Sequence, residues 1–160
     1  MKRRWHRFHW VAMVALASFA AWQAWAEETK FTPEDAVKLA KAGAALIEKM
    51  GVDEARKILH DPDGGYLKGD KELYVLVMNF KGEWVIYPPF PETEGKSALH
   101  VKDVDGKLLV QDMIAVARDK GEGWVKYRWI HPPTQKIRPK ETFVVRVPGQ
   151  EIFSAVGIYP

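Results

Sequence analysis

The sequence of 160 residues contains no cysteine. This absence excludes disulfide bonds, a thiolate nucleophile, cysteine-ligated zinc, iron–sulfur clusters, covalently attached c-type haem and a lipid-anchored N-terminal cysteine. A chain without such cross-links must be held together by burial of a hydrophobic core. The part of the chain after position 26 is long enough for one such core, so we expect a single domain over residues 27–160.

The body of the chain also lacks an excess of basic residues. The formal net charge is +3, but four of the 24 basic residues lie within the first seven positions, which leaves 20 basic against 21 acidic residues. A domain that binds nucleic acid presents a basic stripe or patch on its folded surface. We therefore expect no nucleic acid partner.

The N-terminal segment has the three parts of a secretory signal peptide. A basic stretch over residues 1–7 precedes an apolar run over residues 10–22, and Ala24-Trp25-Ala26 has the small-x-small pattern of a cleavage site. We expect a signal peptide over residues 1–26, cleavage near Ala26, and a periplasmic or secreted domain with no stable membrane span after cleavage.

An uncleaved membrane anchor is the alternative interpretation of this segment. Its apolar stretch, residues 10–26, has 17 residues, of which only Ser18 and Gln23 are polar. That is shorter than the roughly 20 residues with which a helix crosses a bilayer. The mass of the mature N-terminus distinguishes the two interpretations.

Helical periodicity predicts three helices. The first spans residues 33–50, with Thr32 as its N-cap, Pro33 at the first helical position and Gly51 at its end. A second spans residues 52–60, before a segment rich in aspartate, proline and glycine. A third runs from about residue 108 to 120, where its apolar residues repeat at helical spacing.

Five segments have the apolar patterns of β-strands. Residues 72–80 are apolar on both faces, which suits a central strand, and a turn joins them to residues 84–87. Between residues 124 and 130, alternation places Tyr127 and Trp129 on one face. Val-Pro-Gly-Gln at 147–150 is a type II turn signal that joins the last two strands. These elements predict an α+β domain with a five-stranded antiparallel sheet.

No pattern of residues favours a metal, a cofactor or catalysis. Asp103-Val104-Asp105-Gly106 resembles the start of a calcium loop but lacks the remaining ligands, so a turn is expected there. The histidines after residue 26 lie in separate segments at no ligand spacing, and no serine lies in a nucleophile elbow. We expect no metal, no cofactor and no enzymatic activity.

An ordered series of motifs in the C-terminal third resembles the Cache sensor family, in particular the single Cache domain of type 2. In that family a glycine pair precedes a Tyr-x-Trp strand, an Asn/His-Pro loop and a lysine follow, and the domain ends on a Gly-x-Tyr strand. The corresponding residues here are Gly121 and Gly123, Tyr127 and Trp129, His131-Pro132, Lys140, and Gly157-Ile158-Tyr159. The resemblance implies a long N-terminal helix packed on a PAS-like five-stranded antiparallel sheet.

The candidate ligand-binding residues are four aromatic side chains and one lysine: Tyr74, Tyr87, Tyr127, Trp129 and Lys140. Tyrosine hydroxyls on an apolar wall orient a polar ligand, and a cation neutralises a carboxylate that enters such a pocket. We place the lysine at the end of a basic loop, residues 136–140, at the rim of the pocket. The alternative for each aromatic residue is a position in the hydrophobic core without ligand contact. The alternative for the basic loop is a solvent-exposed loop with no role in binding.

The Cache resemblance implies a small carboxylate ligand such as acetate, pyruvate or lactate. Two positions differ from the family pattern, since Tyr87 stands where many relatives have histidine and Phe143 replaces a tyrosine. The proline-dense segment 88–95 is either a cover for the site or an ordinary surface crossing.

The sequence therefore predicts an exported sensor or binding domain for a small molecule. Most Cache relatives are extracytoplasmic parts of chemoreceptors or kinases, with a second membrane helix after the domain. This sequence ends at Tyr159-Pro160, so we expect a separate membrane receptor or kinase to read the bound state. The alternative is a ligand-free structural or interaction module of the periplasm with a filled core.

Overall fold

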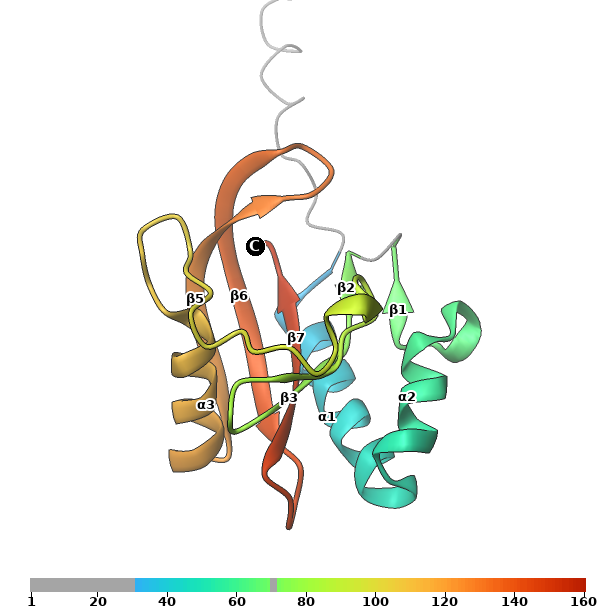
Figure 1. Ribbon diagram of the computed structural model, residues 1–160. Coiled ribbons are helices and arrows are strands. Elements are labelled where there is room, and N and C mark those ends of the chain that lie inside the picture. Colours follow the sequence, from blue (N-terminus) through green and yellow to red (C-terminus); the bar gives the residue numbers. More distant parts are fainter. Residues whose placement is uncertain (1–30, 70–71) are drawn as a thin grey trace, which may run out of the picture.

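A computed structural model of the protein describes residues 31–69 and 72–160 (Figure 1). Its helices are α1 (Pro33–Met50), α2 (Val52–His60) and α3 (Leu109–Asp119), with short 3-10 helices at Pro62–Gly64 and Pro91–Thr93. Its strands are β1 (Leu67–Lys68), β2 (Leu73–Tyr74), β3 (Leu76–Asn79), β4 (Trp84–Ile86), β5 (Glu122–His131), β6 (Lys136–Arg146) and β7 (Ile152–Ile158). The predicted signal peptide lies outside the described residues. None of the described helices has the length and apolar character needed to cross a membrane.

Helix α1 begins and ends at local signals in the sequence. The Thr32 hydroxyl accepts a hydrogen bond from the Asp35 amide at 3.2 Å, and the Asp35 carboxylate accepts one from the Thr32 amide at 2.9 Å. This reciprocal pair is a capping box, which satisfies amides that the first helical turn leaves without partners. At the other end Gly51 has φ +81°, a conformation that favours glycine.

The main sheet has five antiparallel strands, as predicted, and their order is β4-β3-β7-β6-β5. The predicted strand 72–80 is divided at Val75, because β2 pairs with β1 in a separate two-stranded sheet while β3 joins the main sheet. The turn between β6 and β7 is present, with Gly149 at φ +69°.

The prediction of a basic loop over residues 136–140 is wrong. These residues form the first half of β6 and pair with β5, so that Lys140 lies opposite Tyr127. The β6–β7 register begins only at Glu141, so residues 136–140 pair with β5 alone. A stretch with one unpaired edge tolerates Pro139, which has no N–H to donate. Pairing with the regular strand β5 therefore makes a strand of a segment that looks like a loop in sequence.

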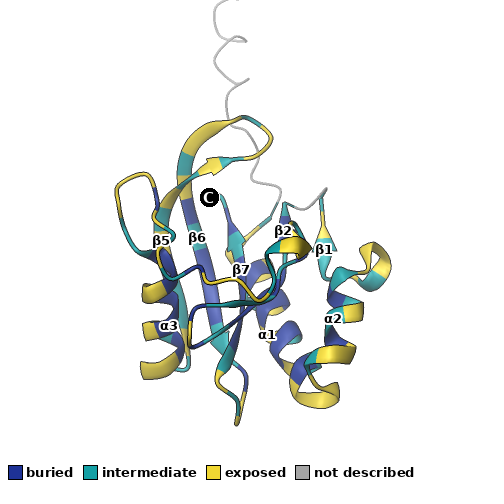
Figure 2. Ribbon diagram, in the orientation of Figure 1, coloured by how far each residue is buried: buried dark blue, intermediate teal, exposed yellow. Residues whose placement is uncertain are grey.

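The sheet has a hydrophobic core on each face (Figure 2). Alternation along β3 sends Val77 to the side of α1 and α2, and Leu76 and Met78 to the side of α3. Helix α3 packs along β5 and β6, and its first turns contribute Leu109 and Met113 to that second core. Beyond this end of α3 the same face of the sheet is covered by loops, and the candidate site lies there.

Candidate ligand-binding site

Two adjacent cavities lie on the α3 side of the sheet. We call the smaller one, of about 70 Å³, the inner chamber, and the larger one, of about 290 Å³, the outer chamber. Four residues border both: Tyr74, Tyr87, Trp129 and Lys140. These shared walls make the two chambers parts of one site.

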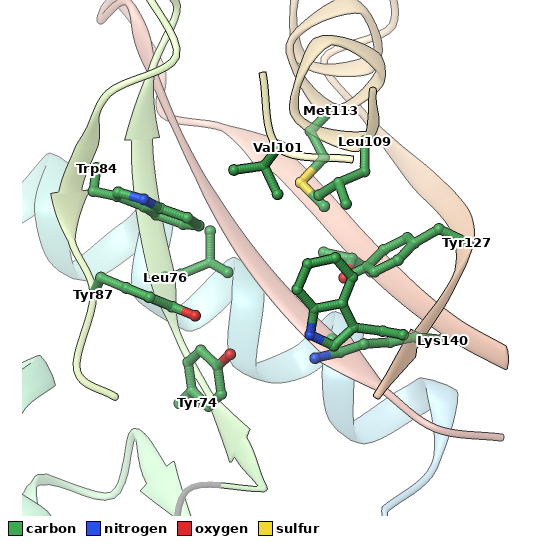
Figure 3. Close-up of a pocket in the computed structure, with 12 residues that line it drawn as sticks. Tyr74, Leu76, Trp84, Tyr87, Val101, Leu109, Met113, Tyr127 and Lys140 are labelled. Atoms are coloured by element: carbon green, nitrogen blue, oxygen red, sulfur yellow. The ribbon is translucent and has the colours of Figure 1, made fainter. Parts of the chain in front are cut away.

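The structure brings all five sequence-predicted site residues to the inner chamber (Figure 3). Tyr74 comes from β2, Tyr87 follows β4, and Lys140 comes from β6. Tyr127 and Trp129 lie on the same face of β5, as their spacing predicts. Phe143 lies in the core on the α1 side, so the absence of a tyrosine hydroxyl at that position does not affect the chamber.

Lys140 is buried rather than placed at a rim, with 9% of its surface exposed. Its aliphatic stem crosses Gly157, where an added Cβ would lie 2.7 Å from Lys140 Cε. Its ammonium nitrogen lies 4.7 Å from the centre of the Tyr159 ring. Burial lowers the pKa of Lys140 to about 8. Within residues 31–69 and 72–160, none of the ion pairs or hydrogen bonds found involves this ammonium group.

Tyrosine hydroxyls form the remaining polar part of the inner chamber. The hydroxyl oxygens of Tyr127 and Thr142 lie 2.8 Å apart, and burial raises the pKa of Tyr127. The hydroxyls of Tyr74 and Tyr87 point toward each other in Figure 3, and, besides burial, the proximity of Tyr87 contributes to the raised pKa of Tyr74. Burial raises the pKa of both phenols, so they remain neutral and able to donate hydrogen bonds at physiological pH.

Apolar side chains close the opposite end of the inner chamber. Trp84 stacks on Tyr87 with a centroid separation of 4.1 Å and an interplanar angle of 9°. The remaining apolar wall consists of Leu76, Val101, Leu109 and Met113. None of these apolar residues is recognisable from the sequence as part of the site. The chamber thus has one polar end, formed by lysine and tyrosines, and one apolar end.

The turn at residues 103–107 fixes the position of strand β5. Asp103 Oδ1 accepts hydrogen bonds from the amides of Asp105 and Lys107, both at 2.9 Å, and Oδ2 accepts one from the Arg128 amide at 3.1 Å. Burial alone would raise the pKa of Asp103, but these backbone hydrogen bonds lower it. Both oxygens of the carboxylate accept hydrogen bonds, two of them from within the turn that the sequence predicts. The third, from the Arg128 amide, anchors β5 at the residue between Tyr127 and Trp129.

A second network, centred on Glu94, fixes the end of β4. Glu94 Oε1 accepts a hydrogen bond from the Tyr87 amide at 2.8 Å and lies 2.7 Å from His60 Nε2. Glu94 Oε2 lies 3.2 Å from Arg56 Nε, and Arg56 also donates to the Val85 carbonyl at 3.1 Å. The proline-dense segment is thereby tied to α2, next to a tyrosine of the chamber.

An antiparallel five-stranded sheet, with a long helix on one face and a loop-covered cavity on the other, is a PAS-like fold. The single Cache domain 2 family matches residues 1–160. The chain belongs to that family, as the motifs of its C-terminal third indicate.

Solved structures share this fold. A Cache chemosensory domain described for carboxylic acid recognition superposes with a TM-score of 0.65 at 20% identity, covering 79% of this chain and 91% of its own. A periplasmic sensor domain of a chemotaxis protein superposes with a TM-score of 0.59 at 27% identity, covering 79% of this chain and 88% of its own.

Among curated proteins, the sensor histidine kinase MctS of Rhizobium johnstonii is 29% identical over 89 residues. These residues are 56% of this chain but 19% of the kinase. The chain therefore corresponds to about a fifth of that relative.

Proposed function

We propose that this protein is an exported sensor domain that binds a small carboxylate in the inner chamber. One observation carries this proposal: the buried ammonium of Lys140 has no carboxylate partner among the described residues and borders a cavity. Burying a cation without a counter-ion is costly, and a bound carboxylate would offset that cost through a charge-assisted hydrogen bond.

The chamber also supports a size limit and an orientation for the ligand. The carboxylate lies at Lys140, within reach of tyrosine hydroxyls that donate hydrogen bonds, and the tail lies against Leu76, Val101 and Met113. A single water requires about 10–15 Å³ of such volume, so about 70 Å³ fits an acid of only a few carbon atoms. Acetate, propanoate, lactate and pyruvate are of this size.

A membrane receptor or kinase reads the bound state in this proposal. Support comes from the family and from the relatives, which include a sensor histidine kinase and a chemotaxis sensor domain. Removal of residues 1–26 during export places the domain in the periplasm or outside the cell, and its role is sensing rather than catalysis. Purification from the periplasm with and without the acid tests whether a receptor or kinase associates with it.

Thermal and chemical unfolding in the presence of each acid tests the ligand class. A ligand at one hundred times its dissociation constant adds about 2.7 kcal/mol to the free energy of unfolding. We expect one of the four acids to stabilise the protein and Lys140→Met to weaken its binding strongly. Lys136→Met is the matched control, because Lys136 is an exposed lysine of the same strand. If no acid stabilises the protein, the ligand-free interaction module becomes the better interpretation.

A further inference from the structure

The proposed function places a short acid in the inner chamber and assigns no role to the larger, outer chamber. An engineered cavity of about 150 Å³ is known to hold benzene. The inner chamber, at about 70 Å³, is too small for such a ring, whereas the outer chamber, at about 290 Å³, is large enough. The outer chamber also approaches the lower end of the range of about 300–1,000 Å³ that is typical of ligand pockets.

Flat rings form most of the wall of the outer chamber. Tyr87 and Phe90 lie with their centroids 5.8 Å apart, and His131 and Tyr159 lie 4.7 Å apart. Pro89 and Pro132 add two further flat apolar surfaces. Phe90 is 54% exposed although it borders a cavity, so part of its surface remains available for contact. Walls of this kind favour a planar apolar group, which gains both buried area and ring–ring contact.

A ligand in the outer chamber can pair one carboxylate with a cationic side chain, and that carboxylate must lie at Lys140. Lys140 borders both chambers, so an acid held by its ammonium can direct its tail into either. Among the described residues that border the outer chamber, Lys140 is the only lysine or arginine.

We propose that the outer chamber is a second compartment of the ligand site and that it takes the ring of a monocarboxylate whose acid group meets Lys140. Carboxylates that carry one flat ring on a short chain are then a ligand class of this protein, in addition to short aliphatic acids. This inference rests on the proposed function, because both classes use the same ammonium group.

A matched pair of acids tests the proposal on the complete protein. Propanoate and 3-phenylpropanoate have the same acid group and chain, and only the second has a ring. We expect both to bind in titration calorimetry, and 3-phenylpropanamide, which has no charge, not to bind. Phe90→Ala should weaken 3-phenylpropanoate about three- to tenfold, the range that one aromatic contact gives, and leave propanoate unchanged. Ile137→Ala is the control, because Ile137 is 50% exposed and borders neither chamber.

The outcomes separate this proposal from the one before it. Binding of propanoate without binding of 3-phenylpropanoate overturns the second compartment and leaves the carboxylate sensor intact. The second compartment is also wrong if 3-phenylpropanoate binds but Phe90→Ala weakens it no more than Ile137→Ala does. If neither acid binds, the carboxylate site itself is wrong, and the ring compartment with it. Unchanged affinity for propanoate in Phe90→Ala shows that this variant is folded.

Discussion

The ammonium nitrogen of Lys140 lies 4.7 Å from the centre of the Tyr159 ring, inside the molecule. A cation over an aromatic face gains about 0.5–2 kcal/mol, which is less than the cost of removing an ammonium group from water. Burial therefore remains the dominant effect and lowers the pKa of Lys140 to about 8, from 10.5 for the free side chain. The domain holds a cation that its own described residues only partly stabilise.

This relationship predicts opposite pH dependences for stability and for binding. Between pH 8 and pH 10, Lys140 is mostly neutral in the folded state and protonated in the unfolded state, so the free energy of unfolding rises with pH. We expect an increase on the order of 2 kcal/mol relative to Lys140→Met, measured by chemical denaturation of the unliganded protein. Affinity for propanoate should instead fall by about tenfold per pH unit above pH 8, because the carboxylate needs the ammonium form.

The pH range of this stability measurement ends at pH 10, because the tyrosines around Lys140 change the free energy of unfolding in the opposite direction. Burial raises the pKa of Tyr127 and Tyr159, so above pH 10 the unfolded state loses their protons first and stability falls. Comparing the free energies of unfolding of the wild-type protein and Lys140→Met at each pH isolates the contribution of the lysine. Parallel curves for the two proteins would contradict the buried position of this ammonium group.

Gly157 leaves room for the lysine side chain in the floor of the inner chamber. An added Cβ at this position would lie 2.7 Å from Lys140 Cε and 2.8 Å from Thr142 Oγ1, and the glycine itself has no strained backbone angle. Gly157→Ala should therefore displace the lysine side chain and weaken propanoate binding about tenfold, a loss of about 1.4 kcal/mol. Titration calorimetry measures the loss.

A double-mutant cycle is the control for Gly157. If the added methyl group acts through the lysine, Gly157→Ala should cost no further affinity in a Lys140→Met background. Equal losses in both backgrounds would instead mean that Gly157 contacts the ligand or supports the fold independently. Chemical denaturation of both alanine variants shows whether the fold is retained.

The elements that the sequence predicts well are those that local residues define. Thr32 and Gly51 specify the two ends of α1 through contacts within a few residues, and alternation alone places Tyr127 and Trp129 on one face of β5. The part of the candidate site on β5 is predictable for this reason. Each of these residues carries its own structural signal in the sequence.

The burial of Lys140 within a strand and the role of Glu94 are the features that could not be predicted. Lys140 follows a polar stretch that contains proline, and only pairing with β5 makes this stretch a strand and buries the side chain. Glu94 is one of several acids in a loop, and its role depends on α2, 34 residues away at His60. Contacts between segments that are distant in the sequence determine where both side chains lie, and no local sequence pattern predicts those contacts.

The hydrogen bond between Tyr127 and Thr142 predicts a coupled effect on stability. Tyr127→Phe removes the partner of the hydroxyl of Thr142, a residue that is 1% exposed, and this should cost about 1–3 kcal/mol in the free energy of unfolding. Thr142→Val should cost a similar amount. The double variant should lose less than the sum, because an apolar pair leaves no buried polar group unsatisfied.

Propanoate binding separates the structural role of Tyr127 from its role at the site. The hydroxyl borders the inner chamber, so affinity should fall in Tyr127→Phe and remain low in the double variant even where stability recovers. Recovery of affinity together with stability would show that the hydroxyl only supports the fold. Denaturation and titration on the same four proteins provide the comparison.

The hydrogen bond between Glu94 and the Tyr87 amide predicts that a residue outside the two chambers affects the affinity for the ligand. Its carboxylate accepts the hydrogen bond of the Tyr87 amide, and its side chain is only 17% exposed. Glu94→Ala should cost about 1–3 kcal/mol in unfolding free energy, because the Tyr87 amide loses its partner and Arg56 keeps only Asp53 and the Val85 carbonyl. It should also weaken propanoate, since the Tyr87 ring is no longer held against the chamber.

Two further variants separate the geometry of Glu94 from its charge. Glu94→Gln keeps an oxygen that can accept the Tyr87 amide but removes the ion pair with Arg56. We therefore expect it to retain most of the propanoate affinity while losing part of the stability. Glu92→Ala, an exposed acid of the same segment, should change neither quantity. If Glu94→Gln binds propanoate as poorly as Glu94→Ala, the charge rather than the position of Tyr87 controls the site, because only the charge is lost in both variants.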